Sequence, residues 1–440
     1  MGLGEALFYF TKVMLTYRHI MSNKYYRKYI RIPPNESIDV RRIINIVNHP
    51  IYQRLLHVSQ LGPTLNIFPG AVHNRFEHSL GVHNKTKKLC QHLVEDGVMN
   101  QKDAYNVSLF ALLHDIGHGP FSHLIEEITS VNHDKLGLKL AYLLAEEIKK
   151  SGGDMEYIAG LFKRQNPFYK IVMDKNMGMD KLDYLFRDIY HTGFGQIPDV
   201  ETMLNYLTFI KGNLVIDKKS LEAARQIQSL YAYMFKQVYL HKSSMISQRY
   251  LQKMISLWLE HSGFNSSELW KLNDAELLAH LYLSDNTTIS GMYKSYFGRN
   301  LPVSGLVIRL KDKQFKERIS GKKIRLVGEN QEFFDKFIAV SGPRQLEALE
   351  AKIASYLKVD SDRIVIVPIL TPWRFIPEDI LYHDNGEVFS LKKTHKDYFE
   401  SLKCDLDDYI AVRVCIVGER EKLYRKADGV HGIIKKTIYS

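Results

Sequence analysis

The chain has 440 residues, of which 45% are hydrophobic and 25% are charged, as in ordinary globular proteins with a large core. Its three cysteines form no CxxC pair, which argues against a disulfide framework and a thiolate zinc site, and no apolar run reaches the ~20 residues that span a bilayer. The net charge of +11 favours a polyanionic partner, either nucleotide phosphates or nucleic acid. We therefore expect a cytoplasmic protein that lies in no membrane.

Apolar residues recur with helical periodicity from about residue 40 onward. After a basic N-terminal extension over residues 1–38, the apolar spacing predicts helices at about 40–58, 73–96, 101–115, 120–128, 133–150 and 219–262, and the segment up to residue 193 also reads as helical. Asn100 is the expected N-cap of the third helix, and pairs such as Gly62-Pro63 and Gly152-Gly153 mark turns. Residues 39–300 are therefore predicted to form a mainly helical bundle.

The residues beyond 300 combine strand and helix signals. β-Branched runs at 306–310, 363–367 and 409–417 predict strands, and the segment 343–358 predicts a helix. Residues 301–440 are thus expected to form a smaller α+β region. The segment 311–325 holds seven lysines and arginines, a pattern more typical of a solvated strand–loop–strand surface than of a phosphate or nucleic-acid patch.

A His-Asp pair closes the helix predicted at 101–115. His114 and Asp115 are followed by Gly-His-Gly-Pro-Phe-Ser-His, so that His118 and His123 come shortly after them. Imidazole and carboxylate together suit a divalent transition metal, and the glycines and proline end the helix and let the backbone close over a site. A lone pair of this kind is more often an ordinary helix end, so further ligands have to come from elsewhere in the chain.

Candidate ligands occur on both sides of this pair. His78 precedes the apolar pattern of the helix at 73–96, and Asp180 begins a helical stretch whose polar residues recur every three or four positions. An ion-paired outer face would explain that stripe equally well. Two imidazoles and two carboxylates are enough for one divalent ion, with positions left for water or phosphate. The predicted ligand set is His78, His114, Asp115 and Asp180.

This order of motifs resembles the HD-domain metal-dependent phosphohydrolases and, more narrowly, the deoxynucleoside triphosphate triphosphohydrolases. The likeness covers about residues 35–260 and is carried by FPGAVHNRFEHSLGV (68–82), HDIGHGPFSH (114–123) and MDKLDYLFRD (179–188). It implies an HD-domain helical bundle in which the four predicted ligands hold a divalent ion: Mg, Mn, Fe, Ni, Co or Zn. It also implies that water attacks the α-phosphate of a dNTP substrate, giving a deoxynucleoside and triphosphate.

The resemblance assigns further roles by position. Proton transfer and phosphate contacts fall to His118, His123, Glu126 and His133, where Glu126 replaces an aspartate of the mammalian relative. Substrate binding falls to Gln60, Leu61, Arg75, Lys181, Tyr184, Asp188, Tyr239 and Lys242. Tyr231 occupies the place of a phosphate-binding arginine, so phosphate affinity or the substrate itself is expected to differ. Gln60, Leu61 and Asp188 would hold the 3′-hydroxyl and crowd out a 2′-hydroxyl.

An activator-nucleotide site is the least conforming part of the resemblance. Gln53 and Arg54 match it, but Asn48 stands in place of a guanine-reading aspartate and Leu56 in place of an arginine. The asparagine carbonyl cannot replace both oxygens of a carboxylate, so we expect altered or absent activation. The resemblance further implies a homo-oligomer, either a dimer or a tetramer. An HD phosphohydrolase for another nucleotide phosphoester and a nucleic-acid-binding or nucleotide-sensing protein remain as alternatives.

Overall fold

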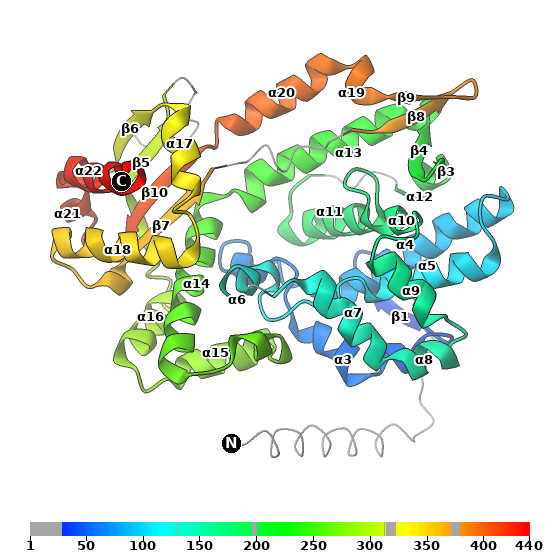
Figure 1. The fold of residues 1–440 in the computed structure, drawn as a ribbon, viewed down its shortest axis with the longest axis horizontal. Helices are drawn as coiled ribbons and strands as arrows, with labels where there is room; N and C mark the ends of the chain where they lie inside the picture. Colours follow the sequence, from blue (N-terminus) through cyan, green and yellow to red (C-terminus); the bar gives the residue numbers. More distant parts are fainter. Residues whose placement is uncertain (1–28, 130, 196–199, 312, 314–322, 371–378) are drawn as a thin grey trace.

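The computed structural model describes residues 29–129, 131–195, 200–311, 313, 323–370 and 379–440. Residues 1–28 of the N-terminal extension and residues 312 and 314–322 of the basic segment lie outside this range. A helical part and a smaller part built on a four-stranded sheet lie side by side (Figure 1). The fold is thus mainly α with an α+β C-terminal region, which confirms the predicted fold class.

The described chain begins with a short antiparallel pair, β1 (Tyr29–Ile32) and β2 (Glu36–Asp39). The helix predicted at 40–58 is divided into α2 (Ile44–Val47), α3 (Pro50–Gln53) and a 3₁₀ turn over Arg54–His57. The division occurs at Pro50, because proline has no N–H to continue a preceding helix but fits the first turn of a new one. His49 caps that new helix through its side chain.

The helical core is built mainly on three helices: α4 (Arg75–Glu95), α5 (Gln101–Leu113) and α11 (Met179–Thr192). Asn74 and Asn100 cap α4 and α5 by accepting backbone N–H groups, so the predicted cap at Asn100 is confirmed. Smaller helices surround these three: α6 (Glu126–Thr129), α7 (His133–Leu143), α8 (Ala145–Lys150), α9 (Met155–Phe162), α10 (Tyr169–Met173) and α12 (Val200–Leu204).

The helix predicted at 219–262 consists of two helices joined by a π turn. They are α13 (Leu221–Met234) and α14 (Lys242–Ser262), and the π turn spans Phe235–Tyr239. Helices α15 (Asp274–Tyr282) and α16 (Thr287–Phe297) follow and pack on α14. Because a π turn changes the direction of successive side chains, Tyr239 leaves the register of α13, and such turns are frequent at functional sites.

Two strands that the sequence analysis did not anticipate interrupt the helical part. They are β3 (Leu207–Ile210) and β4 (Asn213–Asp217), which pair antiparallel. Strand β4 also pairs in parallel with β8 (Leu381–Asp384), and β8 pairs with β9 (Glu387–Ser390). The four strands form one sheet only when residues from the middle of the chain and from its C-terminal region come together, so local periodicity carried little signal for them.

The C-terminal region forms a second sheet in the order β6-β5-β10-β7. Its strands are β5 (Val303–Leu310), β6 (Arg325–Glu329), β7 (Ile364–Ile369) and β10 (Ala411–Ile416). The helices of this region are α17 (Gln331–Ile338), α18 (Pro343–Leu357), α19 (Leu391–Thr394), α20 (Lys396–Asp407), α21 (Arg420–Arg425) and α22 (Ala427–Tyr439). The strands predicted at 306–310, 363–367 and 409–417 and the helix at 343–358 are therefore confirmed.

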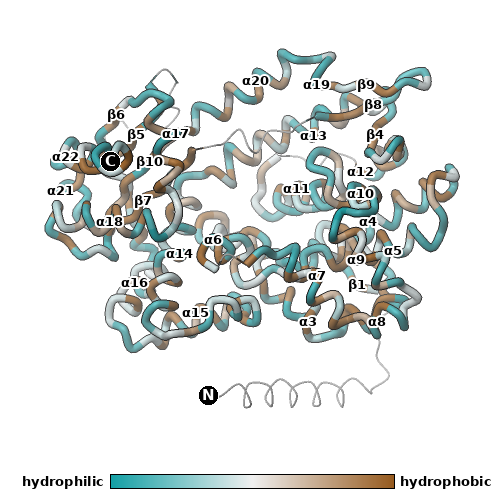
Figure 2. Tube along the Cα trace, viewed as in Figure 1, coloured by the Kyte–Doolittle hydropathy of each residue, from teal (hydrophilic) through white to brown (hydrophobic). Residues whose placement is uncertain are grey.

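Buried apolar side chains form three clusters, one in the helical core, one between the second sheet and its helices, and one between that sheet and α14–α16. Polar and apolar residues alternate along helices such as α20, as amphipathic surface helices require (Figure 2). Among the described residues, no helix combines the length and apolar character needed to cross a membrane.

Candidate active site

Four side chains predicted to bind a metal converge where α4, α5 and α11 meet. His78 lies near the start of α4, His114 and Asp115 directly follow α5, and Asp180 lies in the first turn of α11. Nε2 of His78 is 3.0 Å from Oδ1 of Asp180 and 3.4 Å from Oδ2 of Asp115. Nε2 of His114 is 3.4 Å from Oδ1 of Asp115 and 3.5 Å from Oδ1 of Asp180.

These distances fit the ligands of one divalent ion. Two ligand atoms that each lie ~2.1 Å from an ion are ~3.0 Å apart at a right angle and ~3.4 Å apart in a tetrahedron. Nδ1 of His114 lies 2.8 Å from the carbonyl oxygen of Ala111, to which it can only donate, so Nε2 carries the lone pair. That Nε2 is buried and has no hydrogen-bond partner among the residues that the structure describes. The residues present therefore fit a divalent metal.

A buried carboxylate on the far side of His78 orients its ring. Oδ2 of Asp183 lies 2.8 Å from Nδ1 of His78, which leaves Nε2 facing the other ligands. Asp183 also accepts hydrogen bonds from Lys85 and Arg187, both buried. Carboxylates in this position fix the tautomer of a metal-binding histidine. No role was predicted for Asp183 from the sequence, although it follows Asp180 by about one helical turn, so that the two side chains leave α11 on neighbouring faces.

Three histidines surround one carboxylate next to the ligand set. Oε1 of Glu126 lies 2.8 Å from Nδ1 of His133, 3.0 Å from Nδ1 of His123 and 3.4 Å from Nδ1 of His118. The rings of His118 and His133 stack with centroids 4.1 Å apart. Nε2 of His118 lies 3.3 Å from Oδ1 of Asp115, so this histidine links the cluster to the metal ligands. The structure thus brings together all four residues that the resemblance made catalytic.

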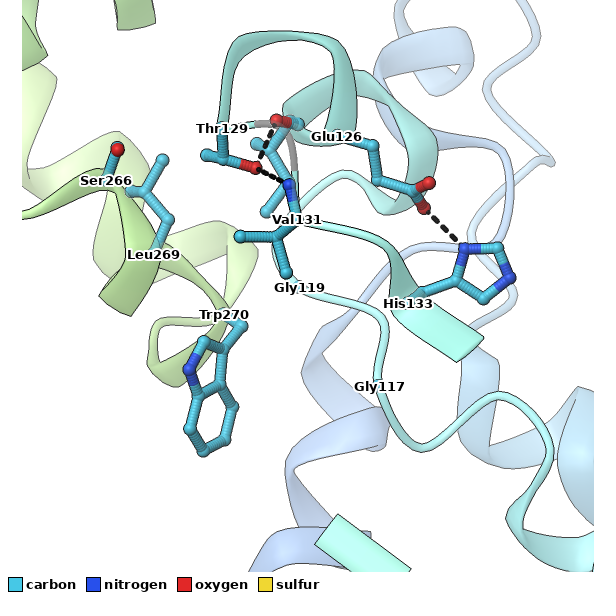
Figure 3. A pocket seen from close by; sticks show the side chains of 10 residues that line it. Gly117, Gly119, Glu126, Thr129, Val131, His133, Ser266, Leu269 and Trp270 are labelled. Carbon is cyan, nitrogen blue, oxygen red and sulfur yellow. Dashed lines mark hydrogen bonds and ion pairs between the residues drawn. The ribbon is translucent and has the colours of Figure 1, made fainter. Parts of the chain in front are cut away.

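The cluster holds its histidines in different protonation states. Burial and the nearby Arg75 lower the pKa of His118 to about 3, so this ring is neutral. Burial lowers the pKa of His133 as well, but its contacts with Asp134 and Glu126 outweigh burial and raise the value to about 10. His123 is the exposed member, with 66% of its side chain accessible. Figure 3 shows Glu126 pointing at His133 beside a small cavity that is closed on another side by Trp270.

Two of the predicted phosphate-binding cations already have partners within the chain. The Arg75 guanidinium contacts Asp115 and donates to Oγ of Ser122 at 2.9 Å. Nζ of Lys181 donates to the carbonyl of Lys175 at 2.6 Å and lies 3.4 Å from the ring centroid of Tyr231. Tyr231, which stands where the family has an arginine, therefore meets Lys181 through its ring.

The predicted sugar-binding residues form a connected group. Asp188 is buried between His73, whose Nε2 lies 2.7 Å from Oδ1, and Tyr239, whose hydroxyl donates to Oδ2. His73 was missed, because only the fold brings it to Asp188. Gln60 is buried, its backbone N–H bonds the carbonyl of His73, and its Oε1 has no hydrogen-bond partner in the described part of the chain. Leu61, also predicted to contact the sugar, is half-buried against the core. Of the other residues predicted to bind substrate, Tyr184 is hydrogen-bonded to Tyr231, and Lys242 is the first residue of α14.

The two residues assigned to an activator site face inward. Nη1 of Arg54 donates to the carbonyl of His118 at 2.7 Å and Nη2 donates to the carbonyl of Ile116 at 2.9 Å. Nε2 of Gln53 donates to the carbonyl of Val47 at 2.8 Å. Arg54 therefore supports the segment that follows His114 and Asp115.

Comparisons with known proteins identify the domain that carries most of this site. Residues 75–172 match the model of the HD domain and residues 198–396 match the model of the HD associated region. An uncharacterised protein of Methanocaldococcus jannaschii is 27% identical over 90% of this chain and 89% of its own length. The deoxynucleoside triphosphate triphosphohydrolase SAMHD1 of Gallus gallus is 31% identical over 37% of this chain and only 34% of its own length.

A solved structure shares the fold over most of the chain. It is a phosphohydrolase from Bacteroides thetaiotaomicron with a TM-score of 0.69 and 22% identity, covering 89% of this chain and all of its own. The HD model includes His78, His114 and Asp115, the residues that converge in the site described above. This chain therefore contains an HD domain followed by an HD associated region, and deoxynucleoside triphosphate triphosphohydrolases are among its sequence relatives.

Proposed function

We propose that this protein hydrolyses deoxynucleoside triphosphates to a deoxynucleoside and triphosphate. The observation that carries the proposal is the convergence of the four side chains predicted to bind a metal beside a cluster of three histidines and one glutamate. The relatives named as deoxynucleoside triphosphate triphosphohydrolases support the substrate class.

The residues of the site can divide the reaction between them. A divalent ion held by His78, His114, Asp115 and Asp180 would polarise a phosphate oxygen and lower the pKa of an attacking water. When water attacks the α-phosphorus, the bond to the 5′-oxygen breaks, and that oxygen needs a proton. A histidine held protonated by Glu126 can donate it, since the carboxylate stabilises the imidazolium until transfer. Cationic side chains and the histidines would hold the remaining phosphates.

The sugar end of the pocket would decide selectivity for deoxyribose. Asp188 and the unpartnered Oε1 of Gln60 offer acceptors for a 3′-hydroxyl. Tyr239 is fixed by Asp188 and would pack against the sugar or base. A pocket that fills the space of the 2′-hydroxyl rejects ribonucleotides by steric exclusion. We also propose that the protein acts as a homo-oligomer, a dimer or a tetramer, which size-exclusion chromatography with light scattering would measure.

Product analysis tests this function directly. Each dNTP and NTP is incubated with the purified protein and Mg²⁺ or Mn²⁺, and the products are separated by ion-exchange chromatography. We expect a deoxynucleoside and triphosphate from dNTPs, and no turnover by Asp180→Ala, which removes one ligand from the ion. Absence of turnover with every metal, or release of pyrophosphate or monophosphate, would contradict the proposal.

Tyr231 favours a second candidate, an HD phosphohydrolase for another nucleotide phosphoester. With an aromatic ring in place of an arginine and in contact with Lys181, the pocket has one cation fewer for a triphosphate chain. The same assay with nucleoside monophosphates and cyclic nucleotides distinguishes the two candidates, because only the second predicts turnover of substrates that lack a triphosphate.

A further inference from the structure

The segment that carries the catalytic groups holds an unfavourable backbone conformation. After Asp115 the chain passes through Gly119 and Pro120 and enters a 3₁₀ turn over Ser122–Ile125. Phe121 and Ser122 have φ values of 57° and 55°, in the left-handed region that side chains larger than glycine disfavour. Such a conformation persists only where surrounding contacts hold it. His118 and His123 lie on either side of these two residues, so their placement depends on those contacts.

One carboxylate from a distant part of the chain supplies one of these contacts and also binds a second segment. Oδ1 of Asp274 accepts the N–H of Phe121 at 2.7 Å, and Oδ2 accepts the N–H of Ser59 at 3.0 Å. Ser59 is the residue before Gln60, whose side chain lines the proposed sugar pocket. Ser122 ties the same two segments together, because its Oγ donates to the carbonyl of Ser59 at 2.7 Å. Asp274 therefore joins the catalytic segment to the sugar-binding segment.

The helix that carries Asp274 does not need this carboxylate for its own cap. Asn273 caps α15 by accepting the N–H of Glu276 at 3.0 Å, and the Glu276 side chain accepts the N–H of Asn273 at 2.8 Å. This reciprocal capping box satisfies the first turn. Asp274 instead points out of the helix to backbone groups from two other segments. Burial raises the pKa of its carboxyl, so the position is costly for the charged form.

Arg54 holds the same segment from its other end. Its guanidinium donates to the carbonyls of Ile116 and His118, whereas Asp274 accepts from Phe121. Arg54 and Asp274 also attract each other electrostatically. The backbone from Ile116 to Phe121 is thus fixed by one cation on two of its carbonyls and one anion on the N–H of Phe121.

We propose that Asp274 is a positioning residue through which the HD associated region holds the histidine-bearing segment and the Gln60 segment in one arrangement. The inference rests on the proposed function for its kinetic consequences only. Asp274 lies within residues 198–396 and its partners lie outside them, so the HD associated region completes the geometry of the active site. A misplacement of a catalytic group by about 1 Å can lower a rate by ~100-fold.

The test compares Asp274 with a neighbour in the same helical turn. Asp274→Ala removes both acceptors, Asp274→Asn keeps one oxygen acceptor, and Glu276→Gln removes one negative charge from the same first turn without touching the catalytic segment. We expect kcat for dNTP hydrolysis to fall by about 10–100-fold in Asp274→Ala, less in Asp274→Asn, and by less than about twofold in Glu276→Gln. Metal content should equal that of the wild type in all three, since the ligands are held by other residues.

Hydrogen–deuterium exchange provides a readout that does not depend on activity. The amides of Ser59 and Phe121 should exchange faster in Asp274→Ala, and the Glu276→Gln variant should match the wild type there. Unchanged exchange at both amides would overturn the proposal. So would losses of kcat in the Asp274 and Glu276 variants that simply follow the decrease in Tm of each variant. A wild-type protein that hydrolyses no dNTP would contradict the proposed function, and the exchange comparison would still decide the role of Asp274.

Discussion

Nδ1 of His78 lies 2.8 Å from Oδ2 of Asp183, a carboxylate that is itself buried between Lys85 and Arg187. The histidine ring is therefore fixed from behind, and its Nε2 is presented to the other predicted ligands. A divalent ion bound by these ligands would thus depend on a charge that does not touch it.

Replacement of this carboxylate should weaken metal binding while all four ligands remain. We expect Asp183→Asn to lower metal affinity by roughly 10–100-fold, because the amide holds His78 less firmly and makes it less basic. Chelator competition followed by mass spectrometry of bound metal measures the effect on folded protein. Asp188→Asn, on the same helix but outside the ligand set, serves as the control and should retain wild-type affinity. Equal affinities in all three proteins would refute the role of Asp183.

The protonation of His133 should depend on Glu126. The pKa of His133 is raised to about 10. The interaction of His133 with Glu126 therefore stabilises the fold fully at a pH below the unfolded pKa of ~6.5, and this stabilisation is lost as the pH rises through about 10. We expect Glu126→Gln to lower the pKa of His133, as followed by NMR titration of its ring protons. Glu127→Gln, whose carboxylate contacts Gln252 instead, should leave that pKa unchanged.

His73 should matter for sugar recognition although it lies behind the pocket. Its Nε2 and the Tyr239 hydroxyl flank the two oxygens of Asp188. We expect His73→Gln to raise KM for dNTPs by about tenfold or more, because a hydrogen bond to a charged group is disturbed. The same variant should have a weaker preference for dATP over ATP. His191→Gln removes a ring that stacks on His73 without contacting Asp188, so a comparable loss of selectivity there would contradict the role of His73.

A buried ion cluster should dominate the stability of the contact between α14 and the second sheet. Glu350 is fully buried and accepts hydrogen bonds from Lys253 at 2.8 Å, Arg249 at 3.3 Å and the N–H of Ile366 at 2.8 Å. Glu350→Gln removes the nearest anion from two buried cations, and we expect a loss of about 3–5 kcal/mol in urea denaturation. Glu347→Gln, half-buried and 3.8 Å from Arg249, should cost less.

Guanine nucleotides should not activate the enzyme. Arg54 is directed at the carbonyls of Ile116 and His118, and the resemblance implies that Asn48 and Leu56 stand in place of an aspartate and an arginine of an activator site. Turnover of dATP should therefore be the same with and without low concentrations of GTP. An increase in kcat on adding GTP would show that this prediction is wrong.

The long helices could be predicted from the sequence because their apolar residues recur at regular spacing, and the four ligands were proposed from their residue types and from the motifs around them. Helices α4, α5 and α14 bury one face over many turns, and His78, His114, Asp115 and Asp180 stand at helix ends where turn residues mark them. The predicted resemblance to HD-domain proteins and the predicted fold class are confirmed, whereas the roles of individual site residues remain predictions.

The residues that were missed share a different property. Asp183, His73 and Asp274 act through partners that are distant in sequence, and an aspartate on a helix or a histidine in a loop has no local pattern that distinguishes a buried contact from a solvated one. Strands β3 and β4 were missed for a similar reason, because their pairing partner β8 belongs to the C-terminal region.

That pairing also sets the order in which the protein can complete its structure during synthesis. Strand β4 lies beside β8, and β8 is followed by β9, so the ribosome has to reach Ser390 before the sheet can close. Until then the edge of β4 has unpaired N–H and C=O groups, and an exposed edge of this kind is a template for pairing with other chains. The nascent protein therefore passes through a stage in which its helical core has formed contacts but one strand edge is open to aggregation.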